Sequence, residues 1–245
     1  MLDTGQELRK GRSLYSNRME NDYGPGRFLL ELEDDGNVVQ YPKGRQNPDS
    51  TYYKSGTNRA SYDVLVFNSS GPLYLMNSMN QLRKNILSKE VDSPELYHLR
   101  ATLDSDGIFQ QYFIWKNRGR KKWNAFSRFP SDIGPCEVPG ACGVNGYCVV
   151  DQDRKAKCQC PRKCSFVNHS YQFGGCKPDF ITGCIDYKRS EYTIIELDNL
   201  NWPNGDYELL EIDEGEWIKA CMEDCFCDAA IYGDNQCWKK NDAID

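Results

Sequence analysis

The cysteines of this chain are confined to its second half, and this distribution constrains the fold more than any other feature. All twelve cysteines of the 245 residues lie between Cys136 and Cys237, so the first 135 residues contain none. A short segment this rich in cysteine is typical of a disulfide scaffold. We therefore expect a cysteine-free part with its own hydrophobic core, followed by a part that disulfides hold together.

Charge, hydropathy and motif content exclude several classes of protein. The chain has 36 acidic against 30 basic residues, a net charge of −6, which argues against a nucleic-acid partner. No apolar run is long enough for a membrane span and no signal peptide is visible, so we expect a membrane link only through a segment absent from this chain. A serine-centred elbow, a glycine-rich phosphate loop and the H-R-D and D-F-G motifs are all missing, so we expect no enzymatic activity and no cofactor.

Three segments of the first part align on a glycine. Gly36, Gly71 and Gly107 are 35 and 36 residues apart, and each lies between two short alternating apolar segments. This pattern predicts three β-hairpins whose apolar residues share one core. The aligned apolar residues are Leu32, Phe67 and Leu103 before the glycine and Val38, Leu73 and Phe109 after it. We expect an all-β, three-sheet prism, and the alternative is a β-sandwich with coincidental spacing.

The first copy carries a row of polar residues at every second position. In a strand such residues share one face, so they could present hydrogen-bonding groups to the hydroxyls of a sugar, with one apolar contact. The row consists of Glu33, Asp35, Asn37, Val39 and Tyr41. It resembles the Gln-x-Asp-x-Asn-x-Val-x-Tyr mannose-binding motif of bulb-type lectins, and the resemblance implies a carbohydrate site on these five residues. Glu33 replaces the glutamine and only accepts hydrogen bonds, so the alternative is a purely structural strand.

The other two copies depart further from the motif. The aligned residues are Asn68, Ser70, Pro72, Tyr74 and Met76 in the second copy and Asp104, Asp106, Ile108, Gln110 and Tyr112 in the third. We expect both to be structural. Residues 1–25 do not fit the repeat, and they resemble the connection that follows an upstream lectin domain in plant lectin receptors.

Six of the first seven cysteines, all but Cys164, have a spacing that resembles an EGF-like module, with ACGVNGYC at its centre and CQCP after it. Spacing alone does not choose among the fifteen possible pairings. The resemblance implies Cys136 with Cys148, Cys142 with Cys158, and Cys160 with Cys176. Zinc is the competing explanation for many cysteines, but no C-x-x-C occurs and His169 is the only histidine of this half, so we expect disulfides and no metal site.

The last segment resembles the PAN/apple-like domain of S-locus-type receptors, on the motifs GCKPDF, DCFCDAAIY and CWKK. The resemblance implies Cys184 with Cys225 and Cys221 with Cys227. Trp217 stands where the family commonly has a cysteine that pairs at the position of Cys237. Cys237 and the additional Cys164 therefore stay unplaced, and they could bridge each other, pair between chains or be free thiols.

Taken together, the motifs resemble the extracellular part of a plant G-type lectin S-receptor-like serine/threonine kinase. We expect a connection over 1–25, a bulb-lectin-like prism over 26–133, an EGF-like module over 134–177 and a truncated PAN-like module over 178–245. The expected function is recognition of a carbohydrate or other extracellular ligand, on the outer side of the plasma membrane or as a secreted protein. The alternatives are a scaffold for receptor homo- or heterodimers and a truncated product. Sequons at Asn68 and Asn168 predict N-glycosylation.

Overall fold

The computed structural model describes residues 1–44, 50–77, 79, 83–117, 122–152, 155–179, 184, 188–191, 193–197 and 206–240. These residues belong to two compact units. The first contains Met1–Ala141 and Gln152–Ala156, and the second contains Cys142–Asp151 and Lys157–Asp245. No helix within the described ranges has the length and apolar character needed to cross a membrane.

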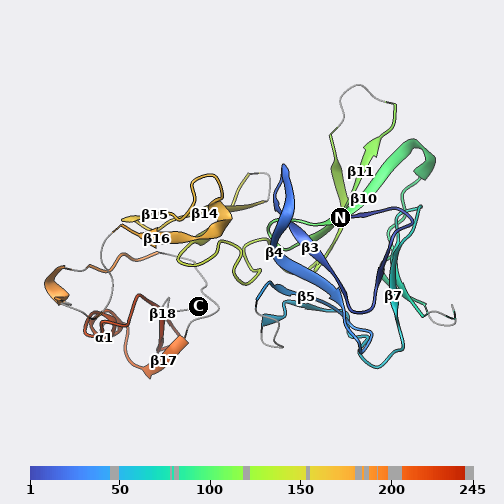
Figure 1. Ribbon diagram of the computed structural model, residues 1–245. Coiled ribbons are helices and arrows are strands. Elements are labelled where there is room, and N and C mark those ends of the chain that lie inside the picture. The colour runs from blue at the N-terminus through green and yellow to red at the C-terminus, as the bar shows by residue number, and fades with distance from the viewer. Residues whose placement is uncertain are drawn as a thin grey trace. The chain divides into compact units, whose positions relative to one another are not determined.

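Three glycine-centred hairpins build the first unit (Figure 1). They are β4 (Asp22–Leu32) with β5 (Val38–Pro42), β7 (Val64–Phe67) with β8 (Leu73–Met76), and β10 (Tyr97–Leu103) with β11 (Phe109–Trp115). Gly36, Gly71 and Gly107 have φ angles of +86°, +117° and +84°. Glycine adopts this region readily because it has no Cβ, so the predicted hairpin turns are confirmed.

Each hairpin is the centre of a four-stranded sheet. The strand orders are β3-β4-β5-β6, β2-β7-β8-β9 and β1-β10-β11-β12. The flanking strands are β1 (Leu2–Asp3), β2 (Glu7–Arg9), β3 (Arg12–Met19), β6 (Tyr53–Lys54), β9 (Arg83–Leu87) and β12 (Asn124–Phe129), and a 3₁₀ turn, η2 (Pro94–Leu96), precedes β10. This is the three-sheet prism that the repeat predicts, and the sandwich alternative is wrong.

The core of the prism is formed by the residues that align between copies. Leu32, Phe67, Val38, Leu73 and Phe109 are each 0% exposed, and Leu103 is 1% exposed. Equivalent residues of the three hairpins therefore meet in one interior, as the sequence alignment predicts. Burial of such side chains stabilises the fold by roughly 1.5–3 kcal/mol each.

The N-terminal residues correct an expectation. Residues 1–25 are not a connection, because β1 pairs with β10, β2 with β7 and β3 with β4, so each edges a different sheet. Leu2 and Leu8 are 5% and 7% exposed. Strands of two and three residues carry almost no periodic signal, and they are ordered only because a distant hairpin supplies their hydrogen-bonding partners.

The first unit also extends past the expected boundary at residue 133. Val138 and Ala141 are 2% and 4% exposed, and an added Cβ at Gly107 would lie 2.8 Å from Cγ1 of Val138. Arg27 donates hydrogen bonds to the carbonyl oxygens of Gly140 and Ala141. The segment that begins the cysteine-rich half is therefore packed on the prism.

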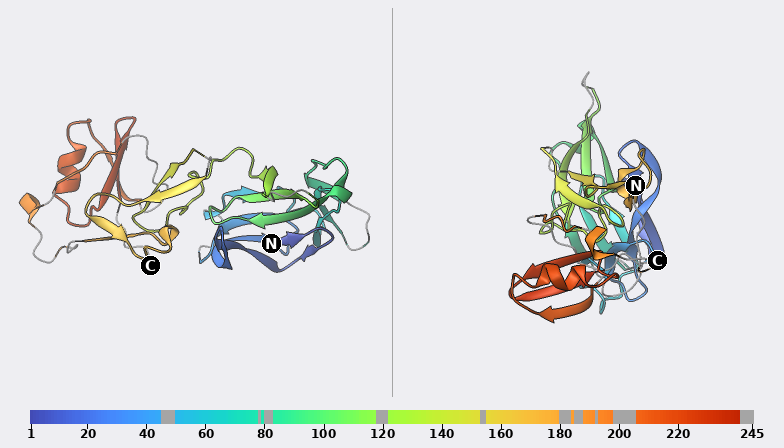
Figure 2. Two further views of the ribbon diagram at one scale, coloured as in Figure 1. Left: turned by 90° about the horizontal axis from the view of Figure 1, so that it is seen from above. Right: turned by 90° about the vertical axis from the view of Figure 1, so that its left-hand side faces the viewer.

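Short antiparallel ladders and one helix make up the cysteine-rich half. β13 (Tyr147–Val150) pairs with β14 (Ala156–Gln159), and β15 (Cys164–Phe166) pairs with β16 (Cys176–Pro178). Further along the chain, β17 (Asp206–Glu211), β19 (Gln236–Lys240) and β18 (Ala229–Gly233) form a sheet in that order, and α1 (Trp217–Met222) contacts β18 (Figure 2). Two 3₁₀ turns, η3 (Gln172–Gly174) and η4 (Arg189–Glu191), complete the described elements.

Disulfides connect these small elements. The structure joins Cys142 to Cys158, Cys160 to Cys176, Cys184 to Cys225 and Cys221 to Cys227. These are the same pairs that the resemblance implies, and Cys136 and Cys148 are also disulfide-bonded. Cys164 and Cys237 are thiols, and Cys237 is buried within β19.

Candidate functional site

The turn of the first hairpin holds three of the five motif residues. The backbone N–H of Glu33 donates to the carbonyl of Asn37 at 2.9 Å, and the N–H of Gly36 donates to the carbonyl of Glu33 at 2.9 Å. Residues 33–37 are thus a closed turn between β4 and β5, not part of an extended strand. This corrects the premise that the motif residues share one strand face, since alternation holds only for extended backbone.

Asn37 is bound within the protein itself. Its side chain is buried, and Oδ1 accepts hydrogen bonds from the hydroxyl of Ser55 at 2.9 Å and the N–H of Thr57 at 3.2 Å. The hydroxyl of Thr57 in turn donates to the carbonyl of Gly36 at 2.7 Å. The amide therefore ties the turn to the segment after β6 instead of facing solvent.

Val39 and Tyr41 are also buried. They are 2% and 5% exposed and pack with Leu29 in one small apolar cluster. The hydroxyl of Tyr41 donates to the carboxylate of Glu31. Neither the apolar contact nor the phenol of the motif is open to a ligand in this structure.

Glu33 and Asp35 lie at the surface of the same turn, in an acidic environment. Burial, followed by the charges of Asp35 and Glu31, raises the pKa of Glu33, while Lys54 opposes this shift. Oδ1 of Asp35 accepts from the N–H of Asn37 at 2.9 Å. The first hairpin thus offers carboxylate acceptors and few donors, which suits a sugar poorly.

The third hairpin holds a polar cluster that the sequence did not predict. Asp104 accepts hydrogen bonds from the hydroxyl of Thr102 at 2.7 Å, the amide of Gln110 at 2.9 Å and the hydroxyl of Tyr112. Asp104, Gln110 and Tyr112 are half-buried. The sequence does align Asp104 and Tyr112 with the motif residues Glu33 and Tyr41. The third copy departs from the rest of the motif, however, so the sequence predicts that it is structural.

Arg100 completes this cluster on the face of the sheet opposite the core. It pairs in register with Tyr112, and its guanidinium carbon lies 5.4 Å from the Tyr112 ring and 4.1 Å from the Trp123 ring. Its Nε is buried, and no hydrogen-bond acceptor for Arg100 occurs among the described residues. Two aromatic rings therefore hold a guanidinium whose donors are not used within that part of the chain.

The carboxyls of Asp104, which is half-buried, and Asp106, which is buried, have raised pKa values. Burial raises the pKa of Asp104, and hydrogen bonds from Tyr112 and Thr102 oppose the shift. Burial and the charge of Asp104 raise the pKa of Asp106 to about 6, and Asp106 accepts from the N–H of Ile108 at 3.1 Å. Lys155 lowers both values and also pairs with Glu20 at 2.9 Å.

The second hairpin has no comparable cluster. Arg83 covers the Tyr74 ring at 3.9 Å, and its Nε donates to Asn85 at 3.3 Å. Asn68 accepts from the N–H of Ser70 within the hairpin turn. The guanidinium of this copy is thus already engaged, unlike that of Arg100.

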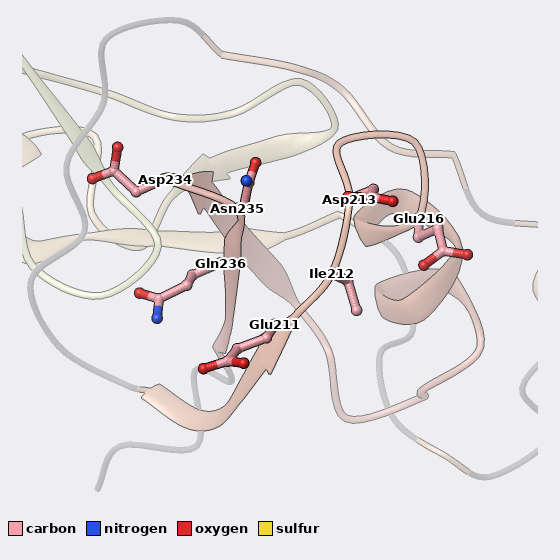
Figure 3. Close-up of a pocket in the computed structure, with 7 residues that line it drawn as sticks. All are labelled: Glu211, Ile212, Asp213, Glu216, Asp234, Asn235 and Gln236. Carbon is pink, nitrogen blue, oxygen red and sulfur yellow. The ribbon is translucent and has the colours of Figure 1, made fainter.

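A pocket of about 430 Å³ lies at the end of the β17-β19-β18 sheet (Figure 3). Glu211, Asp213, Glu216 and Asp234 contribute carboxylates to it. Within the described ranges, no group of three or more His, Cys, Asp or Glu side chains is placed to hold a metal ion. The pocket is acidic and open, with no geometry that selects a ligand.

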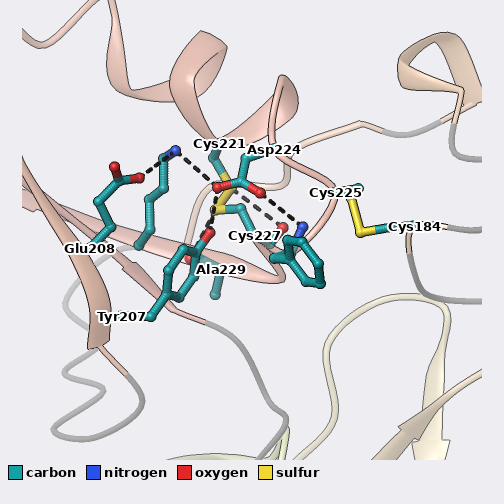
Figure 4. A network of polar contacts seen from close by, with 10 residues as sticks. Cys184, Tyr207, Glu208, Cys221, Asp224, Cys225, Cys227 and Ala229 are labelled. Atoms are coloured by element: carbon teal, nitrogen blue, oxygen red, sulfur yellow. Dashed lines mark hydrogen bonds and ion pairs between the residues drawn. A yellow bond between two sulfur atoms is a disulfide. The ribbon is translucent and has the colours of Figure 1, made fainter.

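A polar network supports the same sheet from another side (Figure 4). Asp224 accepts from the hydroxyl of Tyr207 at 2.8 Å, from Lys239 at 3.1 Å and from the N–H of Phe226 at 3.0 Å, and Lys239 also pairs with Glu208 at 2.8 Å. Burial raises the pKa of Asp224, but these hydrogen bonds outweigh it and the pKa is lowered. Lys239 is buried, so the network is structural.

Comparisons with known proteins place these features in a family. The S-locus glycoprotein domain family matches residues 53–170. The G-type lectin S-receptor-like serine/threonine-protein kinase LECRK2 of Oryza sativa subsp. indica is 35% identical over 96% of this chain. The related kinase RLK1 of Arabidopsis thaliana is 32% identical over 96% of this chain. The chain spans about a third of the length of these relatives, 31% and 30% respectively.

Among solved structures, the monomeric monocot mannose-binding lectin of Gastrodia elata is 21% identical, with a TM-score of 0.37, over 54% of this chain and 96% of the lectin. The mannose-specific snowdrop (Galanthus nivalis) agglutinin is 18% identical, with a TM-score of 0.33, over 54% of this chain and 97% of the agglutinin. The sequence relationship, which covers both the prism and the cysteine-rich half, carries the assignment. The chain is related in sequence to the G-type lectin S-receptor-like proteins over 96% of its own length and corresponds to part of their extracellular region.

Proposed function

We propose that this chain is a ligand-recognition region of a plant lectin receptor-like kinase and that it binds a carbohydrate on the outer side of the plasma membrane. The relatives are named as lectin receptor kinases, and a kinase part belongs to those longer proteins. The disulfides support an oxidising, extracellular compartment. EGF-like and PAN-like modules are our interpretation of the cysteine-rich half.

One observation carries the carbohydrate proposal, namely the Arg100 guanidinium held between Tyr112 and Trp123 beside Asp104. Sugar hydroxyls both donate and accept, so a site needs both kinds of partner. Arg100 supplies donors, and Asp104, Gln110 and Tyr112 supply an ordered set of polar atoms beside it. We therefore assign the proposed site to the third hairpin, and we rank the first-hairpin residues below it.

The test is a glycan-array screen followed by calorimetric titration of the oxidised chain. Arg100→Gln removes the donors and should weaken binding by about tenfold or more, since one charged hydrogen bond is worth about 1.5–3 kcal/mol. Arg83→Gln is the control, because it removes a cation that covers a tyrosine ring of the second hairpin, Tyr74. Loss of affinity in the control variant alone would contradict the assignment.

A third variant, Glu33→Gln, examines the first hairpin. It restores the amide of the mannose motif and should leave affinity unchanged if Asn37, Val39 and Tyr41 stay in their internal contacts. A gain in mannose affinity would instead place the working site on that turn.

A second candidate function is a protein-interaction scaffold with a silent lectin fold, which would support receptor dimers. The observation that favours it is the use of Asn37, Val39 and Tyr41 within the protein. Analytical ultracentrifugation over a range of concentrations tests it. A concentration-dependent dimer together with an empty glycan array would favour the scaffold, and a monomer with a positive array would reject it.

A further inference from the structure

The prism contains a pocket of about 680 Å³ that shares only Trp123 with the Arg100 site described above. Five places line it: the end of β1, the turn of the second hairpin, η2 with the start of β10, the residue after β11 and the residue before β12. Its lining includes Asp3, Ser69, Glu95, Tyr97, Lys116 and Trp123. The pocket therefore lies wholly within the first unit.

Aromatic rings form the walls of this pocket and are held in place by their neighbours. The Tyr97 ring packs 4.3 Å from the Trp115 ring and 5.2 Å from the Phe113 ring. The guanidinium of Arg100 covers one side of Trp123 at 4.1 Å. Such pre-positioned rings offer apolar faces at low conformational cost.

Charges of both signs surround the aromatic walls. Asp3 and Glu95 supply acceptors, and Lys116 supplies donors. A strongly anionic or cationic ligand would face like charges here. The lining instead suits a neutral ring with one apolar face and several hydroxyl or amide groups, which describes a pyranose such as N-acetylglucosamine.

A glycosylation sequon of this chain lies beside the pocket and could carry such a sugar ring. Ser69, which lines the pocket, is the middle residue of the sequon Asn68-Ser69-Ser70. Oδ1 of Asn68 accepts from the N–H and the hydroxyl of Ser70 at 2.9 and 3.1 Å, and within the described residues its amide nitrogen has no partner. Adjacent Cα atoms are about 3.8 Å apart, so a sugar attached to Asn68 would start at the rim of the pocket.

We propose that Asn68 carries an N-linked glycan and that the first N-acetylglucosamine residues of this glycan pack into the pocket against Tyr97 and Trp123. The glycan then becomes a structural part of the prism and occupies a site closed to free ligands. This proposal concerns a covalently attached sugar and not a free ligand, and its pocket shares Trp123 with the proposed Arg100 site.

The second sequon provides a matched control. Asn168 is exposed in the second unit, and its Oδ1 accepts from the N–H of Ser170 at 2.9 Å, the same turn geometry as at Asn68. Neither pocket described above is lined by Asn168 or its sequon neighbours. A glycan at Asn168 should therefore extend into solvent.

The experiment uses the full chain secreted from a eukaryotic host. Intact mass before and after Asn68→Gln and Asn168→Gln reports the occupancy of each site. An endoglycosidase that cuts between the two core sugars is then applied to the native protein, and each cleavage rate is divided by the rate for the same site in the reduced, denatured chain. We expect the relative rate at Asn68 to be about three- to tenfold lower than at Asn168, as for a weak stacking contact.

Two pocket variants separate packing from simple crowding. Trp123→Ala should raise the relative cleavage rate at Asn68 to that at Asn168. Lys116→Ala should raise it partly, and because Lys116 is exposed this substitution leaves the hydrophobic core unchanged. Hydrogen exchange at residues 95–99 and 122–124 should be about three- to tenfold faster in Asn68→Gln than in Asn168→Gln. An unoccupied Asn68, equal relative rates in the native chain, or rates insensitive to both pocket variants would overturn the proposal.

Discussion

Gln40 should destabilise the prism, and its replacement by methionine should stabilise it. The side chain is 0% exposed on β5, and neither Nε2 nor Oε1 has a hydrogen-bond partner among the described residues. A buried polar atom without a partner costs about 1–3 kcal/mol. The equivalent position of the second hairpin, four residues after the glycine, is Leu75, which is also 0% exposed, so this layer of the core accepts an apolar side chain.

We expect Gln40→Met, which nearly conserves volume, to raise the free energy of unfolding of the first unit by about 1–3 kcal/mol. For a unit of this size that corresponds to a rise in Tm of roughly 3–10 °C. Because the chain has two compact units, the readout is hydrogen exchange of β5 and β8 amides under increasing urea, which reports on the prism alone.

Gln111→Met is the matched control at the equivalent position of the third hairpin. The amide nitrogen of Gln111 donates to the carbonyl of Gly71 at 2.7 Å, but its Oε1 is buried without a partner among the described residues, so Gln111→Met loses one bond and removes one unpaired atom and should change stability by less than about 1 kcal/mol. A clearly larger gain for Gln40→Met than for Gln111→Met supports the reasoning. A Gln40→Met chain with unchanged or lower stability would show that the Gln40 amide is satisfied in solution and would refute it.

Three further predictions concern charge and backbone. Because burial and the charge of Asp104 raise the pKa of Asp106 to about 6, the contribution of Asp106 to the stability of the prism should be greatest below about pH 4 and should fall by roughly 3 kcal/mol at most as the pH rises to 6 and above. Asp106→Asn should flatten this part of the dependence of the urea midpoint on pH. Gly107→Ala should lower the free energy of unfolding by more than about 2 kcal/mol, because the added Cβ would meet Val138 at 2.8 Å. Gly44→Ala is the control and should lower it by about 1 kcal/mol, because φ is similar there and nothing lies within 4 Å. Equal losses by urea denaturation would contradict the packing argument. Lys239→Met should lower the stability of the β17-β19-β18 sheet by about 1–3 kcal/mol because it strands Asp224 and Glu208, whereas Lys188→Met, at an exposed pair, should change it by less than about 0.5 kcal/mol; hydrogen exchange in β18 and β19 compares the two.

The parts of the fold that sequence reasoning predicts are the parts that local pattern specifies. A positive-φ glycine between two alternating segments is sufficient to predict a hairpin, and the register of Leu32, Phe67 and Leu103 predicts a shared core. β1 and β2 could not be predicted in this way. Their order comes from hydrogen bonds to strands far along the chain, and a two- or three-residue segment has no period to detect.

The candidate site also has features that local pattern predicts and features that depend on distant contacts. The spacing of the first-hairpin motif is correct, but spacing alone does not say where extended backbone ends, and the turn at Gly36 places Asn37 against Ser55 and Thr57. Arg100 escaped detection because its importance depends on Trp123, a residue on another strand connection. A pattern of alternate residues along one segment carries no information about packing between distant segments.

The edge strands β1, β2 and β3 also constrain the order in which strands can pair while the chain is being synthesised. Arg12 can pair only after Leu32 is made, Glu7 only after Val66 and Leu2 only after Ala101, so all three strands are synthesised before their partners. At about 5–20 residues per second, synthesis of the hundred residues that separate Leu2 from its partner takes about 5–20 s. Until its partner strand is made, each of these short strands keeps its backbone N–H and C=O groups unpaired and open to pairing with other chains.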